Sequence, residues 1–322
     1  MIDTRLNKSI DNIDPSLFDF ASYDESRAER TGYSDYSYWQ STFHVFLKNK
    51  VAATLLILIT VLVVYTVLQP YLPNQKLPTK IYNDVQTGIQ LRNHAPDKEF
   101  WFGTNSIGQD LWSRIWSGTR TSLEIGLLVG IWQALIGITI GCIWGYVRKL
   151  DGIITEIYNV LDNIPNTIIM VLLAYILRPS ILTLVVAMCI TNWLSMARFV
   201  RNQIIIIRDR EYNLASRCLG TPINRIITKN LLPYLVSVIM LQLALAIPMA
   251  IGSEVFLTYI GLGLPLNIPS LGNLINEGRI IMMSPSLRYQ LIFPAVVLSV
   301  ITISFYVIGN TFADASDPRN HV

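Results

Sequence analysis

The chain has 322 residues, of which 52% are hydrophobic and only 15% are charged, and its mean hydropathy is +0.42. Soluble domains have nearly a quarter of their residues charged, so this balance indicates a protein that uses lipid as its solvent. The formal net charge of +3 is small and the basic residues are dispersed, which excludes a nucleic-acid-binding surface.

Cysteines and histidines are few and far apart. They are Cys142, Cys189 and Cys218, and His44, His94 and His321. Neither set has the spacing of a disulfide framework, a metal site or a nucleophilic catalytic site. The sequence also contains no Gly-rich phosphate-binding loop ending in Gly-Lys-Ser/Thr. We therefore expect no catalytic residue, no metal ligand and no cofactor in this chain.

Six apolar stretches are long enough to cross a membrane, because about 20 helical residues span about 30 Å of hydrocarbon. They cover residues 51–69, 122–147, 154–177, 181–200, 231–252 and 289–310. Only Arg178-Pro179-Ser180 separates the third stretch from the fourth, which predicts a tight hairpin. The expected fold is an all-α polytopic membrane protein with six transmembrane helices.

Lysines and arginines near the ends of these spans indicate the orientation. With the N-terminus inside, the inner segments are 1–50, 148–153, 198–230 and 311–322, and the outer segments are 70–121, 178–180 and 253–288. The inner segments then hold 16 basic residues and the outer segments 9. This bias favours an arrangement with both termini in the cytoplasm.

The composition also divides the chain into segments. They are a polar cytoplasmic tail at 1–36, an interfacial helix at 37–50, a transmembrane domain at 51–310 and a cytoplasmic tail at 311–322. Aromatic residues followed by lysines suit the 37–50 segment to the headgroup region, although a simple extension of the first span explains the same pattern. Proline and glycine punctuate the outer segments 70–121 and 253–288, which predicts loops and short re-entrant pieces.

The inner loop 201–230 carries the signals of a short helix on the cytoplasmic side. Asp209 is a suitable N-cap, and Glu211 favours the positive end of a helix. Gly220 suits the left-handed position after a helix, and Pro222 prevents its continuation. A helix of about ten residues is marginal alone in water, so we expect it to be held by packing.

One face of this predicted helix is suited to a partner. Leu214 with Cys218 or Leu219 forms a narrow apolar stripe, and the small residues Ala215 and Ser216 allow close approach. A short helix of this kind, projecting into the cytoplasm, is typical of a segment that docks in the groove of another protein.

Residues 211–233 resemble the EAA loop of bacterial ABC import permeases, whose coupling helix seats in a cleft of the ATP-hydrolysing subunit. The matching positions are Ala215, Gly220, Leu232 and Pro233. Leu214 stands where the family has glutamate, Ser216 where it has a second alanine, and Asn230 where it has isoleucine. The resemblance implies that Glu211, Leu214, Ala215, Ser216, Gly220 and Pro233 couple this chain to an ATPase.

Further motifs follow in order between residues 44 and 322. They are Phe102 to Leu123 (in which Asn105 and Gln109 depart from the pattern), Leu161 to Pro165, Trp193 to Arg201, Tyr259 to Gly272 and Ala313 to Arg319. Together they resemble the second, C-type permease subunit of the oligopeptide/dipeptide/nickel family, most of all the oligopeptide permeases of Gram-positive cocci.

The resemblance implies a type I ABC importer permease in the bacterial plasma membrane, which forms half of a path for peptides and works by alternating access. The implied partners are a homologous second permease subunit, two ATP-binding subunits and an extracellular peptide-binding lipoprotein. ATP would be bound by the partners and not by this chain. Nickel or another small solute is the alternative cargo. The coupling loop argues against a secondary transporter or channel that needs no ATPase. An intramembrane enzyme would need a Ser/His or His/Glu/Asp constellation within the spans, and the sequence has none.

Asp162 and Pro165 are candidates for lining the path. Asp162 lies about eight residues into the third span, roughly 12 Å from its inner end. A carboxylate at such a depth costs about 2.5–3.5 kcal/mol and is expected to face a water-filled cavity or the bundle interior. The structural alternative is a buried hydrogen bond in which the Asp162 carboxylate accepts from Asn163, Asn166 or a partner helix.

Overall fold

The computed structural model describes residues 38–177 and 180–316. These residues are helical, and their extended segments pair only through isolated β-bridges. The predicted tail 1–36, Arg178 and Pro179 of the predicted hairpin, and the final residues 317–322 lie outside the described part of the chain.

Helices α2 and α3 meet at Asn49. Helix α2 covers Tyr38–Lys48 and α3 covers Lys50–Leu68, followed by a 3-10 turn, η2, at Gln69–Tyr71. The Asn49 side chain caps α3 by accepting hydrogen bonds from the backbone N–H groups of Val51 at 3.1 Å and Ala52 at 3.2 Å. The segment predicted as an interfacial helix is thus a helix separate from α3, and its location at the membrane surface stays a prediction.

Helix α4 covers Leu111–Tyr146 and has 36 residues. It begins inside the segment 70–121 that the sequence analysis assigned to an outer loop. The start is set by Asp110, whose carboxylate accepts hydrogen bonds from the backbone N–H of Ser113 at 2.8 Å and from its hydroxyl at 2.6 Å. Local capping therefore extends the helix beyond its apolar stretch.

The predicted third span is not one straight helix. Helix α5 covers Arg148–Asp162 and α6 covers Asn166–Ile176, and the two are bent by 71° at the break between them. Pro165 explains the break, because it has no N–H to continue the helix and disfavours helical geometry in the residue before it.

Helix α7 covers Ile181–Arg208 and α8 covers Glu211–Cys218. The chain then forms one long helical segment from α9 at Ile223–Ile226 through a π turn, η3, at Ile227–Leu231 to α10 at Leu232–Tyr259. Pro233 is the second residue of α10, two positions after the last residue of the π turn. It cannot donate to the carbonyl of Lys229 and would collide with it, and the wider π turn accommodates both effects.

The predicted outer segment 253–288 contains the end of α10, a short helix α11 at Leu271–Ile281 and a 3-10 turn, η4, at Pro285–Leu287. Helix α12 follows at Tyr289–Ala315. The buried Glu254 of α10 anchors α11: its carboxylate accepts hydrogen bonds from Ser270 at 2.7 Å and Ser122 at 3.3 Å. Helix α11 is thereby tied to α4 and α10 by polar contacts, and its predicted re-entrant position stays a prediction.

Small residues bring α4 and α7 close together. Gly137, Gly141 and Gly145 repeat every four residues on α4 and face Met196, Val200 and Ile204 of α7. A Cβ atom placed on Gly141 would lie only 2.6 Å from the carbonyl oxygen of Ala197. This small-residue packing is the means by which membrane helices associate without a hydrophobic driving force between them.

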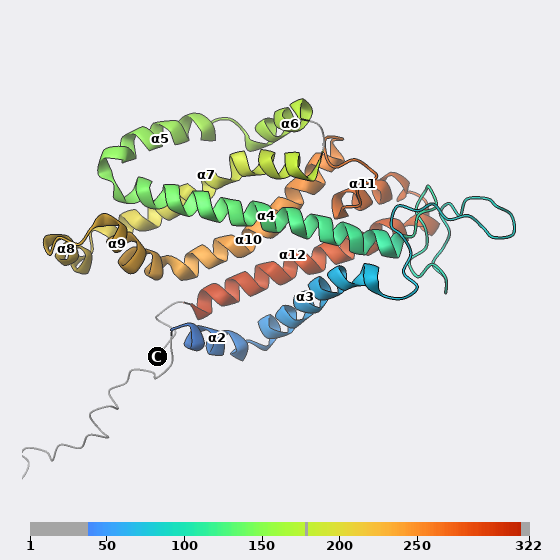
Figure 1. Ribbon diagram of the computed structural model, residues 1–322, viewed down its shortest axis with the longest axis horizontal. Coiled ribbons are helices and arrows are strands. Elements are labelled where there is room, and N and C mark those ends of the chain that lie inside the picture. Colours follow the sequence, from blue (N-terminus) through green and yellow to red (C-terminus); the bar gives the residue numbers. More distant parts are fainter. Residues whose placement is uncertain (1–37, 178–179, 317–322) are drawn as a thin grey trace, which may run out of the picture. The chain divides into compact units, whose positions relative to one another are not determined.

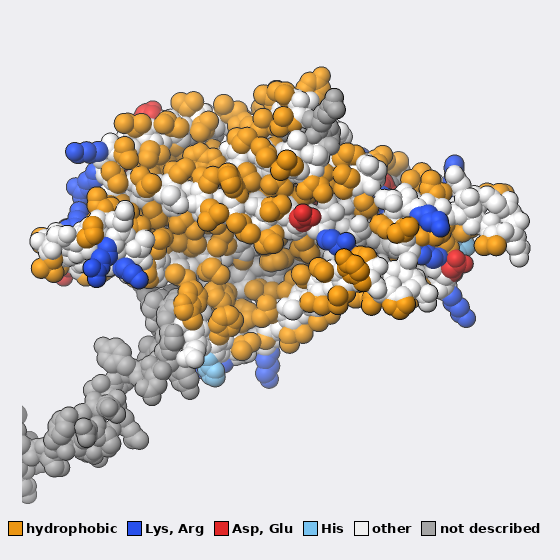
Figure 2. All heavy atoms as spheres, viewed as in Figure 1, with side chains coloured by type: hydrophobic (Ala, Val, Ile, Leu, Met, Phe, Trp, Pro, Cys, Tyr) orange, Lys and Arg blue, Asp and Glu red, His pale blue; other side chains and the backbone are white. Residues whose placement is uncertain are grey.

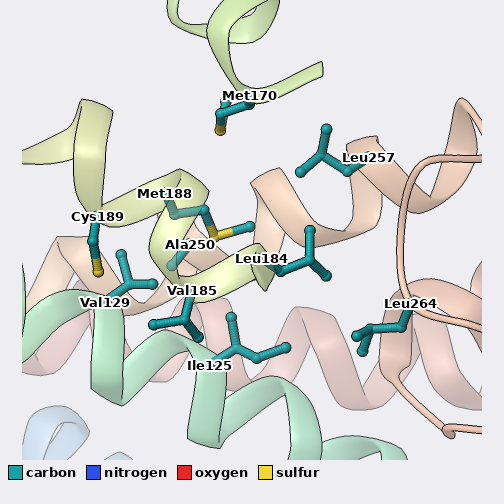
Figure 3. Close-up of a cluster of buried hydrophobic side chains, with 10 residues drawn as sticks. All are labelled: Ile125, Val129, Met170, Leu184, Val185, Met188, Cys189, Ala250, Leu257 and Leu264. Atoms are coloured by element: carbon teal, nitrogen blue, oxygen red, sulfur yellow. The ribbon is translucent and has the colours of Figure 1, made fainter. Parts of the chain in front are cut away.

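The apolar core lies where α4, α6, α7 and α10 meet, as Figure 3 shows. It consists of Ile125, Val129, Met170, Leu184, Val185, Met188, Cys189, Ala250, Leu257 and Leu264. Because a single cluster draws on four helices, their relative positions are coupled.

Among residues 38–177 and 180–316, five helices or helical segments are long and apolar enough to cross a membrane, and there are six if the bent pair of α5 and α6 is one span. Figure 1 shows that α8 and α9 lie at one end of these helices, and that residues 72–110 and α11 lie at the other. On the face shown in Figure 2, hydrophobic side chains cover most of the surface between the two ends. This distribution is what a membrane-embedded bundle requires.

Candidate functional site

Helix α8 is the predicted coupling helix, and it begins one residue later than the sequence analysis expected. The N-cap is Arg210, in an extended conformation and without a side-chain capping bond. The prediction that Asp209 caps the helix was wrong, because its carboxylate is engaged by three arginines. Those are Arg148 at 2.9 Å, Arg217 at 3.0 Å and Arg208 at 3.3 Å.

The three ion pairs place the Asp209 carboxylate between α5, α7 and α8. Burial acts to raise the pKa of Asp209, but hydrogen bonds from Arg217 and Arg148 outweigh it and keep the pKa below its ordinary value. Arg148 comes from the start of α5 and Arg217 from the last turn of α8. The ion pairs therefore tie α8 to both α5 and the end of α7.

The end of α8 follows the prediction. Gly220 has a φ of +76°, the left-handed geometry that favours glycine. The N–H of Gly220 donates to the carbonyl of Arg217 at 3.0 Å, and the N–H of Thr221 donates to the carbonyl of Ser216 at 3.1 Å. These two bonds form a Schellman motif, which satisfies the last carbonyls of the helix. Pro222 then caps α9 from an extended conformation.

The Asn213 side chain links α8 to α7 and to the π turn before α10. It is fully buried, and its amide nitrogen donates to the carbonyl of Ile207 in α7 at 2.9 Å. Asn230, in the π turn before α10, donates to the Asn213 side-chain oxygen at 3.2 Å and to the Ser216 hydroxyl at 3.3 Å. The sequence analysis treated Asn230 only as a departure from a motif and did not identify Asn213, because a single polar residue in a short helix does not reveal its partner.

The opposite face of α8 is open. Glu211, Leu214 and Ala215 are exposed, and Leu214 retains 43% of its accessible surface. Leu219, just after the helix, is 86% exposed, whereas Ser216 is half-buried by its bond to Asn230. A shallow hollow of about 710 Å³ beside this face is lined by Arg148, Asp209, Leu214, Arg217 and Cys218. The structure thus gathers all the predicted coupling residues of α8 at one end of the molecule, with Pro233 at the start of α10.

Asp162 and Pro165 lie at the break between α5 and α6, and both are exposed. The Asp162 carboxylate forms an ion pair with Arg198 of α7 at 3.5 Å, and Arg198 also donates to the Tyr158 hydroxyl at 3.0 Å. The hydrogen bonds to Asn163 or Asn166 that the sequence suggested are not among those of the described residues. The path-lining role of Asp162 and Pro165 stays a prediction.

Metal chemistry has little support in the arrangement of side chains. Among residues 38–177 and 180–316, no three His, Cys, Asp or Glu side chains lie close enough together to hold a metal ion. Cys142 and Cys189 are buried, and Cys218 is exposed on α8.

Comparison with known families assigns most of the chain. Residues 137–322 match the family described as binding-protein-dependent transport system inner membrane component. Residues 37–96 match the N-terminal TM domain of oligopeptide transport permease C. The two matches together include α2, α3 and the chain from Gly137, in the last third of α4, onward.

Curated relatives align along nearly the whole length. The chain is 36% identical over 311 residues to the oligopeptide transport system permease protein AmiD of Streptococcus pneumoniae, covering 96% of this chain and 99% of that protein. It is 32% identical over 312 residues to OppC, an oligopeptide transport system permease protein of Bacillus subtilis, covering 96% and 98%. It is 35% identical to the dipeptide transport system permease protein DppC of the same organism, covering 88% of this chain and 86% of that protein.

A solved structure has the same fold. The MetNI methionine ABC transporter in an inward-facing conformation contains a chain that superposes with a TM-score of 0.51 at 19% sequence identity. The match covers 63% of this chain and 96% of that chain. The family match and the relatives therefore establish that the chain belongs to the binding-protein-dependent transport system inner membrane components, the membrane-embedded permeases of ABC importers, and its bundle of apolar helices agrees with their fold.

Proposed function

We propose that this permease forms half of the translocation path of a peptide importer, and that α8 transmits the work of an ATPase to the membrane helices. The relatives that align over most of the chain are named as oligopeptide and dipeptide permeases, which supports peptide as the cargo. Nickel, the alternative cargo suggested by the wider family, has no specific observation in its favour.

The observation that carries the proposal is that α8 is attached to both α7 and the segment leading into α10. Only Asp209 and Arg210 separate it from α7, and the buried Asn213 side chain bonds to Ile207 of α7 on one side and receives a bond from Asn230 on the other. A displacement of α8 is therefore passed to α7 and to the helical segment that continues into α10. A short helix fixed on one face and open on the other is suited to coupling.

The partners follow from this assignment. The proposed complex contains a homologous second permease subunit, two ATP-binding subunits on the α8 side and an extracellular peptide-binding lipoprotein on the opposite side. The ATP-binding subunits supply the nucleotide sites, and this chain performs no catalysis itself. Shifting a two-state equilibrium from 1:99 to 99:1 takes about 5.5 kcal/mol of differential binding, which α8 must receive from the ATP-binding subunits.

The cargo is tested with the complete transporter. The chain is reconstituted in vesicles with its second permease, ATP-binding subunits and binding protein, and uptake of radiolabelled peptides and of radioactive nickel is measured with and without ATP. We expect ATP-dependent uptake of peptides and none of nickel. Nickel uptake without peptide uptake would overturn the assignment of the cargo.

The role of α8 is tested by Ala215→Asp, which adds a charge and volume to its exposed face. We expect at least about a tenfold loss of uptake, equivalent to about 1.4 kcal/mol of lost docking energy, together with reduced co-purification of the ATP-binding subunits. Asn224→Asp is the matched control, because it adds the same charge at an exposed position of α9. Full uptake by Ala215→Asp would remove α8 from the mechanism.

A further inference from the structure

A polar hollow lies among the membrane-spanning helices, away from α8. Its volume is about 470 Å³. Its polar lining comes from α4, α6, α7 and α10 and consists of Gln133, Asn166, Thr167, Asn192, Ser195 and Ser253. Among the described residues that line it, none carries a charge.

The depth of this hollow makes its polarity significant. Asn192 lies about 16 Å along α7 from Ile181, since each helical residue adds about 1.5 Å, and α7 has 28 residues. Gln133 is likewise far from both ends of α4. Polar side chains at such depth are unfavourable in contact with lipid and are expected to face the bundle interior or a water-filled cavity. Six of them converging from four helices indicate a site for polar groups.

The side-chain amides of the hollow have few hydrogen-bond partners, whereas the hydroxyls of Ser195 and Ser253 donate to the carbonyls of Asn192 and Met249, each at 3.0 Å. Within residues 38–177 and 180–316, the side-chain amides of Gln133 and Asn166 have no hydrogen-bond partner. The Asn192 oxygen accepts only a long bond of 3.4 Å from Thr191, and its NH₂ group is not engaged. Each amide offers both a donor and an acceptor, the pair of groups that a peptide bond presents in return.

Apolar residues that line the same hollow are suited to contact the varied side chains of different peptides. Met170, Met249 and Phe256, together with Gly252, complete the lining. Figure 3 shows Met170 on α6 pointing toward Met188 of α7 and Leu257 of α10. Methionine side chains are flexible and polarizable, and they adapt to ligands of different shape.

The charged side chain that the sequence analysis considered for the path lies outside the hollow. Asp162 is not part of its lining, and its carboxylate is paired with Arg198 at 3.5 Å. The hollow therefore offers neutral donors and acceptors without a charge that would favour one class of peptide.

We propose that this hollow is a transient binding subsite for the main-chain amide groups of a passing peptide, and that it accepts acidic, neutral and basic peptides alike. The inference rests on the proposed peptide transport and adds to it the residues and the chemistry of one step of the path. The competing occupant is a set of polar side chains from the second permease, which would fill the hollow permanently.

The first test introduces a charge into the neutral lining of the complete transporter. Asn192→Asp is compared with Asn192→Leu, and Gln133→Glu with Gln133→Leu, in uptake of lysine-bearing and acidic peptides of equal length. The same binding protein serves all variants, so its own preferences cancel in the ratio of variant to wild type.

We expect the acidic variants to shift uptake toward lysine-bearing peptides by at least about fivefold, the effect of two unit charges about 4 Å apart even in bulk water. The leucine variants are expected to slow both peptide classes equally. An unchanged ratio in a correctly assembled Asn192→Asp or Gln133→Glu transporter would overturn the proposal.

The second test measures occupancy. Ser253→Cys in a background without Cys142, Cys189 and Cys218 is labelled with a small thiol reagent, and Ser299→Cys on the exposed face of α12 is the matched control. We expect peptide delivered by the binding protein to slow labelling at residue 253 severalfold, equally for acidic and basic peptides, and to leave residue 299 unaffected.

Two results of the second test would overturn the proposal. A thiol at residue 253 that is never labelled would assign the hollow to the second permease, and one that is labelled at the same rate with and without peptide would exclude binding. In either case peptide uptake by the same vesicles would leave the proposed function intact. Vesicles that take up no peptide at all would contradict the proposed function itself.

Discussion

Two single residues, Gly220 and Asp162, connect local geometry to transport most directly. Gly220 ends α8 with a φ of +76°, and a Cβ atom added there would meet nothing within 4 Å. Its requirement for glycine is therefore a matter of backbone conformation and not of space. Asp162 is held by Arg198 across the break between α5 and α6, so its charge has a partner within the chain.

Gly220→Val is expected to weaken coupling, because a β-branched residue in left-handed geometry costs on the order of 1–2 kcal/mol. Gly220→Asn is the matched control, since asparagine tolerates that geometry. We predict a several-fold loss of peptide-stimulated ATP hydrolysis for the valine variant and near-normal hydrolysis for the asparagine variant. Equal activity of the two variants would show that the end of α8 does not need this conformation.

Asp162→Asn separates the two roles that the sequence left open for this residue. Because Asp162 pairs with Arg198, we expect lysine-bearing and acidic peptides to be slowed by the same factor. The charge-swapped pair Asp162→Arg with Arg198→Asp should restore part of the uptake in reconstituted vesicles. A loss confined to lysine-bearing peptides would instead show that the carboxylate meets the cargo.

At the scale of elements, close packing and a hydrogen bond hold α4 against α7. The close approach at Gly137, Gly141 and Gly145 leaves no room for side chains on that face of α4. Arg208 at the end of α7 also donates to the carbonyl of Gly145 at 2.6 Å, which fixes the two helices at the α8 end. We infer that α4 and α7 move as one unit when α8 is displaced.

Gly141→Ala tests this contact. The added Cβ would lie 2.6 Å from the Ala197 carbonyl oxygen and 2.7 Å from the Val200 Cβ, and overpacking of this kind costs about 1–3 kcal/mol. We predict that the variant lowers the thermal unfolding temperature of the purified complex by several degrees. Gly152→Ala on α5 is the matched control, because nothing lies within 4 Å of its added Cβ and helix propensity alone favours the change.

At the scale of the whole molecule, the segments predicted to be outside lie at one end of the spans, and the predicted cytoplasmic segment with α8 and α9 lies at the other. Residues 72–110 and α11 lie opposite α8 and α9 (Figure 1). This separation agrees with the excess of basic residues in the segments predicted to be cytoplasmic. The orientation itself follows from the rule that cytoplasmic loops are rich in lysine and arginine.

Single cysteines at Asn74 and Asn224 test the orientation in a cysteine-free background. Asn74 follows η2 and Asn224 lies on α9, and both side chains are exposed. We expect an impermeant thiol reagent to label residue 74 in intact cells and residue 224 only after the membrane is opened. External labelling of residue 224 would reverse the orientation and place α8 outside.

The sequence by itself predicted what depends on neighbouring residues. Apolar length predicted the spans, since the thickness of the hydrocarbon sets about 20 residues for each helix. Gly220 and Pro222 predicted the end of α8, because the left-handed turn and the missing N–H are properties of those residues. The motifs that follow one another along the chain indicated the family in the same way.

Only the tertiary structure decided which side chains meet across helices. Asp209 fits an N-cap locally, yet the ion pairs with Arg148, Arg208 and Arg217 determine its role. Asn213 looks like any polar residue of a short helix until α7 and the π turn before α10 enclose it. The polar hollow arises from four helices whose residues are spread from Gln133 to Ser253, so no local pattern marks it. Such sites depend on the relative rotation and spacing of the helices, which packing at contacts such as Gly141 sets and which the period of one helix does not contain.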